Sequence, residues 1–260
     1  MHYGELTWTD IAAQRHKVVV VPIGSLEQHG HHLPLLTDTL IGGEVARRAE
    51  AALGDTALFL PPLWVGASDH HRGFPGTVSL SSAVYIQVLQ EILECLIGAG
   101  FRRIVLLNAH GGNEVPGSVA IYETQLRHRS ALPDLWIAFA SWMVIAGPQI
   151  AAIDALAQKQ VTHACELETS MILQLAPQLV RMELARGANI PFESVFYTPD
   201  FSGASRVSVP RAFDQLSATG AFGHPEVADA AKGETLFAIA AQEVVAFVQE
   251  FAVWQPITPV

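Results

Sequence analysis

Cysteine is nearly absent from this chain of 260 residues, which contains only Cys95 and Cys165. Two cysteines do not make the kind of disulfide framework that holds small secreted domains together. The amino terminus also lacks the basic and then apolar order of a secretory signal peptide. On these grounds we expect the protein to be cytoplasmic.

Positive charge and long apolar runs are also limited. The chain has 15 lysines and arginines against 25 acids and no basic cluster, so nothing favours a nucleic-acid partner. No apolar run approaches the ~20 residues that a membrane-spanning helix needs. Half of the residues are hydrophobic, which excludes disorder. We therefore expect one soluble domain over residues 1–260 that binds a small-molecule substrate and neither nucleic acid nor membrane.

Short aliphatic runs alternate with helical patterns along the chain. The strands are expected at 18–23, 57–61, 102–107 and 135–140. Helices are expected at 38–53, from Ser81 or Ser82 to about 98, after 113, at 151–158 and at 225–251. Such alternation predicts an α/β fold in three layers, with a mostly parallel central sheet between two layers of helices.

Two further expectations concern packing. In the helix that begins at Ser81 or Ser82, helical spacing predicts a buried stripe of Val84, Val88 and Ile92 with Cys95 or Leu96, so that Cys95 belongs to the core. The segment 181–211 has no sustained period and several glycines and prolines. Long irregular segments of this kind more often form a lid or a subunit contact than a linker.

Side chains of the metal-ligand type follow three of the expected strands. They are Glu27, His29 and Asp38 after the first, Asp69, His70 and His71 after the second, and His110 after the third. In open α/β sheets, sites form at the carboxyl ends of the strands. Carboxylates and imidazoles are common ligands of zinc, manganese and iron. The loops therefore predict a metal site, the alternative being a polar loop that merely collected histidines.

Four ordered stretches, GSLEQHGHHLPLLTD, GASDHHRGFPGTVSL, LLNAHGGN and HACELETS, resemble the signatures of the creatininase family of metal-dependent amidohydrolases. The later stretch TGAFGHPEVADAAKGE resembles the family's glycine-proline entry to the last helix, with His224 where an aspartate is usual. The resemblance covers most of the chain and implies a creatininase-like fold.

The resemblance also implies a site with two divalent metal ions per chain, zinc, manganese or iron. Asp38 would bridge them, with Glu27 and His110 on one ion and His29 on the other. Glu168 is the candidate for the remaining ligand. Creatininase takes that carboxylate from a Tyr-Glu pair directly after the equivalent of His110, where this chain has two glycines.

Spacing alone does not favour Glu168. If residues 163–168 were all helical, Glu166 would share a face with His163, whereas Glu168 would point about 140° away. The choice of Glu168 therefore rests on the resemblance and requires a helix that begins only near Cys165.

The resemblance assigns His163 as the catalytic general acid, which protonates the leaving nitrogen after attack by a metal-activated hydroxide. The alternative is a histidine of the core. His71 is assigned to the substrate or to the support of a ligand. Trp142 would stack on a flat substrate unless it belongs to the core or to an interface. The remaining loop histidines, His31, His32 and His70, are expected to be solvated, and Asn108 and Asn113 to brace the His110 loop.

The predicted function is that of an amidohydrolase, which cleaves a small non-peptide carbon-nitrogen bond in a cyclic amide or a formamide. The absence of a side chain at Gly112 argues against creatininase proper. The alternatives are a peptidase-like or a keto-sugar ring-opening hydrolase of the same family, or an inactive metal-binding scaffold. The resemblance further implies a homohexamer in which the segment 181–211 reaches a neighbouring subunit.

Overall fold

A computed structural model describes residues 1–188, 190–199 and 205–256. At its centre is a four-stranded sheet in the order β2-β1-β3-β4, in which all three neighbouring pairs are parallel. The strands are β1 (Val18–Ile23), β2 (Ala57–Phe59), β3 (Arg103–Asn108) and β4 (Trp136–Ser141). The sequence located all four strands, although β2 is shorter than expected and both β3 and β4 begin and end one residue later.

The α-helices are α1 (Trp8–Ala13), α2 (Thr37–Leu53), α3 (Ser82–Gly98), α4 (Glu114–His128), α5 (Trp142–Ile145), α6 (Gly147–Ala151), α7 (Glu166–Leu175) and α8 (Ala230–Phe251). Short 3-10 turns lie at Tyr3–Glu5, Gly54–Thr56, Asp69–His71, Gly111–Asn113, Pro177–Leu179, Met182–Leu184, Phe213–Gln215 and Pro225–Val227. Within the described residues, no helix has the length and apolarity that crossing a membrane requires.

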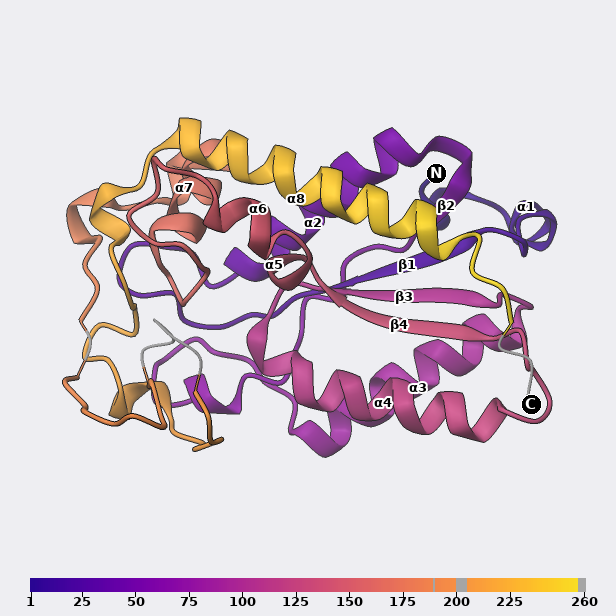
Figure 1. Ribbon diagram of the computed structural model, residues 1–260, viewed down its shortest axis with the longest axis horizontal. Coiled ribbons are helices and arrows are strands. Elements are labelled where there is room, and N and C mark those ends of the chain that lie inside the picture. The colour runs from indigo at the N-terminus through magenta and orange to yellow at the C-terminus, as the bar shows by residue number, and fades with distance from the viewer. Residues whose placement is uncertain (189, 200–204, 257–260) are drawn as a thin grey trace.

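Helices cover both faces of the sheet, with α2 and α8 on one side and α3 and α4 on the other (Figure 1). The valines of β1 alternate between two apolar clusters. Val18 and Val20 pack toward α2 and α8, and Val19 and Val21 pack toward α3. Since both faces are covered, every residue of β1 is buried. The prediction of a three-layer α/β fold is confirmed, whereas the single domain over 1–260 stays a prediction.

The buried stripe of α3 differs from the expected one. The helix packs through Tyr85, Leu89 and Leu93, followed by Leu96 and Ile97, whereas Val84 is 44% exposed. Apolar residues occur on several sides of α3, so periodicity admitted two neighbouring stripes, and the one with the larger side chains faces the core. Cys95 lies outside this stripe and is exposed, so its assignment to the core was wrong.

In contrast, α4 turns its smallest residues toward the sheet. Gly117 and Ala120 are buried, and a methyl group on Gly117 would collide with the Phe139 ring. This close approach leaves larger apolar side chains outside, and Val115 and Tyr122 are 76% and 66% exposed.

Two expected helices have different bounds. The helix expected at 151–158 lies earlier, as α6, because Pro148 suits the first turn of a helix and residues after Ala151 form turns. The last helix begins at Ala230 instead of Pro225, because the Asp229 side chain accepts a hydrogen bond from the Lys232 backbone and caps it there. Of the irregular segment 181–211, positions 189 and 200–204 lie outside the described residues.

Candidate metal centre

Four segments bring ligand-type side chains to the carboxyl end of the sheet. The loop after β1 contributes Glu27 and His29, the first turn of α2 contributes Asp38, the loop after β3 contributes His110, and the first turn of α7 contributes Glu168. All five residues are at most 4% exposed. Ionisable groups are rarely buried so completely unless they are paired or bind a metal.

Asp38 lies at the centre of these groups. Its Oδ1 is 2.9 Å from His29 Nε2, and its Oδ2 is 2.9 Å from His110 Nδ1. Ligand atoms within 4.8 Å of one another form two sets that share this residue, one with Glu27 and His110 and the other with His29 and Glu168. This is the grouping that the sequence resemblance implies, and the assignment of metal ions to it stays a prediction.

Backbone carbonyls orient the two imidazoles. The Nδ1 of His29 lies 3.2 Å from the Glu27 carbonyl oxygen, and the Nε2 of His110 lies 3.3 Å from the Ala67 carbonyl oxygen. Because a carbonyl only accepts, each of these nitrogens carries its hydrogen. The other nitrogen of each ring therefore faces Asp38, which is the arrangement found in metal-binding histidines.

The electrostatics of the cluster are strongly perturbed. Burial alone would lower the pKa of His29, but the carboxylates around it, first that of Asp38, raise this pKa to about 9. Burial would raise the pKa of Asp38, which His29 and His110 nevertheless hold well below its usual value. Burial raises the pKa of Glu168 to about 7 against the opposing effect of His29. Such concentrated shifts are typical of functional sites.

The Glu27 carboxylate shows most clearly that this cluster fits a cation. Both of its oxygens are buried, and neither has a hydrogen-bond partner among the described residues. An unsatisfied buried carboxylate is costly. Oxygen and nitrogen ligands in two sets that share one carboxylate suit a pair of divalent ions such as zinc, manganese or iron. The residues present therefore fit the implied metals.

Asparagine side chains hold the loops in place. Asn108 accepts a hydrogen bond from the His110 backbone N–H and donates one to the His110 carbonyl, so its predicted bracing role is confirmed. Asn113 makes its side-chain hydrogen bonds to other loops, since it accepts one from the Ala67 N–H and donates one to the Gly24 carbonyl. It thereby ties the loop after β2 to the end of β1.

His163 lies beside the cluster and is almost fully buried. Its Nε2 donates to the Gln28 carbonyl oxygen at 2.9 Å, and its Nδ1 lies 3.9 Å from Glu27 Oε1. Burial, reinforced by His29, holds the pKa of His163 well below its usual value. The next residue, Ala164, has a φ of 48°, a strained conformation for a residue other than glycine and one that is often found at functional sites.

The structure places the two acids of α7 differently. Because the helix begins at Glu166, residues 163–168 are not all helical, and helical spacing from His163 does not apply. Glu166 points away from the cluster and pairs with Lys232 at 2.8 Å. Glu168 lies with His29 and Asp38. The expectation of a helix start near Cys165 is confirmed.

Three of the loop histidines are buried or half-buried. His71 is 1% exposed, and its Nε2 is 3.2 Å from Glu27 Oε1. His70 is half-buried against His71 and stacks on His110 with ring centroids 5.6 Å apart. His32 is buried and bonds Thr169. The expectation that His32 and His70 are solvated was wrong, whereas His31 is exposed as expected.

Phe213 packs on His70, His71 and His163, and the sequence analysis did not identify it. The ring lies 4.2 Å from the His71 ring and 4.9 Å from the His163 ring, measured between centroids. It belongs to an irregular stretch without periodicity, more than 130 positions after His71 in the chain, so no local signal marks it. The Phe213 ring therefore contributes to the burial of His71 and His163.

Trp142 is not part of the cluster. Its side chain is 1% exposed and packs in the core between the sheet and α8. This position agrees with the core alternative that the sequence left open and leaves no ring face for a substrate.

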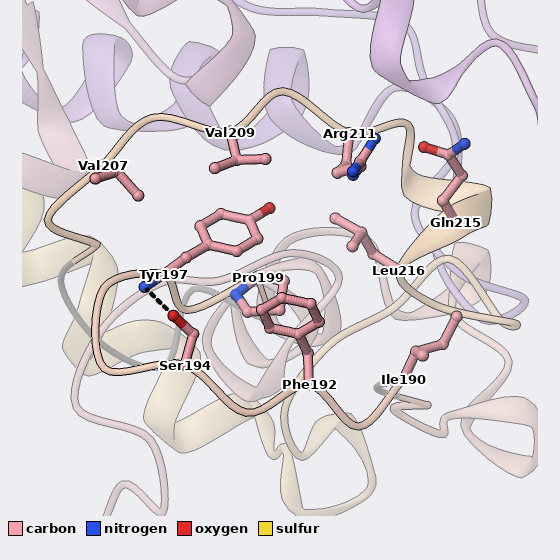
Figure 2. Close-up of a pocket in the computed structure, with 10 residues that line it drawn as sticks. All are labelled: Ile190, Phe192, Ser194, Tyr197, Pro199, Val207, Val209, Arg211, Gln215 and Leu216. Atoms are coloured by element: carbon pink, nitrogen blue, oxygen red, sulfur yellow. Dashed lines mark hydrogen bonds between the residues drawn. The ribbon is translucent and has the colours of Figure 1, made fainter.

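A separate cavity of about 490 Å³ is lined by side chains between positions 190 and 216, and Figure 2 shows them around a common space. The lining is mostly apolar and aromatic, with Arg211 and Gln215 among its polar members. The 3-10 turn Phe213–Gln215 connects cavity and cluster, because Gln215 lines the cavity whereas Phe213 packs on the histidines.

Comparison with known proteins identifies relatives over most of the chain. The family model described as Creatininase, creatinine amidohydrolase, matches residues 4–248. A mycofactocin precursor peptide peptidase from Mycolicibacterium smegmatis is 33% identical over 238 residues, which is 88% of this chain and 85% of that protein. A creatinine amidohydrolase from Pseudomonas putida is 31% identical over 69% of this chain and 74% of its own length.

Solved structures agree with these matches. A crystal structure of creatinine amidohydrolase superposes with a TM-score of 0.79 at 28% identity and covers 96% of this chain and 97% of the other. A manganese form of creatininase superposes with a TM-score of 0.78 at 27% identity and covers 96% and 97%.

The two acids of α7 make the ligand assignment testable. Glu168→Gln is expected to retain about one metal ion per chain, because it loses a ligand of one set only. Glu166→Gln should keep both ions but lower the free energy of unfolding by about 1–3 kcal/mol, because it weakens a buried charged hydrogen bond. Elemental analysis and urea unfolding of both variants check this. The reverse pattern of metal loss would refute the assignment.

Proposed function

The chain belongs to the creatininase family of hydrolases, and on that basis we propose that it is a metal-dependent amidohydrolase that cleaves a carbon-nitrogen bond. The observation that carries the proposal is the pair of ligand sets joined at Asp38, next to a buried Glu27 carboxylate without a hydrogen-bond partner among the described residues.

In this proposal, Asp38 would help to hold both metal ions. Glu27 and His110 would complete one site, and His29 and Glu168 the other. When bound, the ions supply activation of a water molecule and polarisation of the substrate carbonyl. Zinc, manganese and iron all suit this mixed set of nitrogen and oxygen ligands.

His163 is proposed to move the proton. With its Nε2–H donated to the Gln28 carbonyl and its pKa lowered, the neutral ring presents an unprotonated Nδ1 toward the cluster. That atom accepts a proton as the water oxygen bonds to the amide carbon, and then delivers the same proton to the leaving nitrogen as the carbon-nitrogen bond breaks. The Phe213 ring, packed against His163, limits access of other water.

The glycine at position 112 leads us to expect a substrate other than creatinine. A methyl group at Gly112 would collide with the Ala67 carbonyl oxygen and with His110 Nε2. This loop therefore has no space for the glutamate that creatininase carries there, and the proposed ligand comes from α7 instead. A pocket built in this way is expected to fit a different small cyclic amide or formamide.

A second candidate is hydrolysis of a bond near the end of a peptide. Among the relatives described above, the peptidase matches a larger share of the chain than the creatinine amidohydrolase does. The mostly apolar cavity beyond Phe213 would also accommodate a substrate that extends past the metal cluster.

We also propose that the protein assembles into a closed homohexamer. The exposed Val115 and Tyr122 on α4 support an apolar subunit contact.

Asp38 is the residue whose loss should affect metal binding most. Asp38→Ala is expected to lose most of both metal ions and all hydrolysis, because a single carboxylate serves both sets. Elemental analysis of the purified variant, beside native protein that has been stripped with a chelator and reloaded, checks this. Native metal content in the variant would refute the bridging role.

Creatinine should be a poor substrate. At low millimolar creatinine we expect little turnover from metal-loaded protein, whereas formamides, lactams or short peptides in the same panel should include a substrate. Rapid creatinine hydrolysis would contradict the argument from Gly112, and no hydrolysis of any member would favour an inactive scaffold.

Assembly can be tested at the surface of α4. Light scattering of native protein at micromolar concentration should give a mass of several subunits, and Tyr122→Lys should reduce it, because a charge would be buried in the contact. A monomeric native protein would rule out the assembly.

A further inference from the structure

The side chain of Gln28 lies between the metal cluster and the stretch that covers it, and it is 4% exposed. Its Oε1 accepts a hydrogen bond from the Gly30 N–H at 2.9 Å, and its Nε2 donates to the Gly220 carbonyl oxygen at 3.1 Å. A backbone N–H only donates and a carbonyl only accepts. These two contacts therefore determine which end of the amide is nitrogen, without reference to any titratable group.

Two ring nitrogens, His71 Nδ1 and His163 Nε2, lie within reach of the second hydrogen of the amide. His163 Nε2 does not accept it, because this nitrogen carries the hydrogen that it donates to the Gln28 carbonyl oxygen. Gln28 Nε2 lies 2.9 Å from His71 Nδ1, which must accept because the amide nitrogen cannot. A neutral His71 consequently carries its hydrogen on Nε2, 3.2 Å from Glu27 Oε1. This contact has the length of an ion pair but not the alignment of a full hydrogen bond, so the carboxylate oxygens stay open to a cation.

The backbone carbonyl of Gln28 determines which nitrogen of His163 carries the hydrogen. His163 Nε2 lies 3.0 Å from Gln28 Nε2 and 2.9 Å from the Gln28 carbonyl oxygen. Because a carbonyl only accepts, the imidazole N–H donates to it, and the contact between the two donor nitrogens is not a hydrogen bond. His71 thus turns an N–H toward Glu27, whereas His163 turns an unprotonated nitrogen toward it.

We propose that Gln28 is a positioning residue that sets the tautomers of His71 and His163, and that His71 supports Glu27 instead of contacting the substrate. The proposal rests on the proposed function, because Glu27 is a metal ligand there. Gly220 adds a physical requirement, since its φ is 78° and a methyl group on it would collide with Gln28 Oε1. The backbone at position 220 therefore needs a glycine in order to approach the Gln28 amide this closely.

The tautomers are directly observable. Solid-state ¹⁵N spectra of protein labelled at the histidine rings, assigned with His71→Gln, should show His71 with a protonated Nε2 and an unprotonated Nδ1, in metal-free and metal-loaded protein alike. In Gln28→Glu the carboxylate can only accept, so His71 Nδ1 should become protonated. Protonated Nδ1 in the native protein, or an unchanged His71 in Gln28→Glu, would overturn the proposal.

Metal affinity supplies the second measurement. Gln28→Met, which keeps the length but removes the donor, should weaken the affinity for one of the two ions about 10 to 100-fold, as the loss of a partner to a metal ligand does. Gln87→Met, at an exposed position on α3, serves as the control and should bind both ions as the native protein does. Equal affinity in the two variants would contradict the supporting role.

The outcomes separate this proposal from the proposed function. If Gln28→Glu fails to fold, the native spectrum still decides the tautomer. If the native protein binds no divalent metal but shows the expected His71 tautomer, the function fails and the positioning stands. If it binds two ions and His71 Nδ1 is protonated, the positioning fails alone.

Discussion

The contact of the Asp38 carboxylate with two imidazoles is the constraint on which the site depends. Each oxygen of Asp38 faces one ring at 2.9 Å, so the loops after β1 and β3 must end at the same place. A parallel sheet in which β1 and β3 are adjacent meets this requirement, because both strands end at the same edge of the sheet. Asp38 also lies in the first turn of α2, where the helix dipole favours negative charge.

The Glu168 carboxylate reaches the cluster from the start of a different helix. Glu168 lies in the first turn of α7, as Asp38 does in α2, so two helix amino termini point toward one buried cluster. The left-handed backbone at Ala164 and the extended backbone at Cys165 keep His163 outside α7, which begins at Glu166. Had the helix started earlier, Glu166 and not Glu168 would share a face with His163. The non-helical backbone before Glu166 therefore explains why helical spacing from His163 does not apply to the two acids.

The side chains beside the cluster are covered by a part of the chain that is remote from the ligands in sequence. Phe213 packs over the histidine rings, and Gly220 receives the Gln28 amide. Both belong to a stretch between α7 and α8 that has little regular structure. Such a stretch shapes the site through packing and backbone polarity, and it also carries the cavity of about 490 Å³, so differences in substrate among relatives are expected to arise there.

The sequence by itself determined the features that depend on neighbours along the chain. Short apolar runs marked the strands, and ligand-type side chains after them marked the edge where the cluster lies. It did not determine features that depend on contacts between distant residues, which leave no periodic trace. The face of α3 that packs on the sheet, the burial of His32 and His70, and the core position of Trp142 are of this kind. The pairing of Glu166 with Lys232, 66 positions apart, and of Gln28 with Gly220, 192 positions apart, was decided only when the chain folded, because tertiary packing and not sequence spacing brings those groups together.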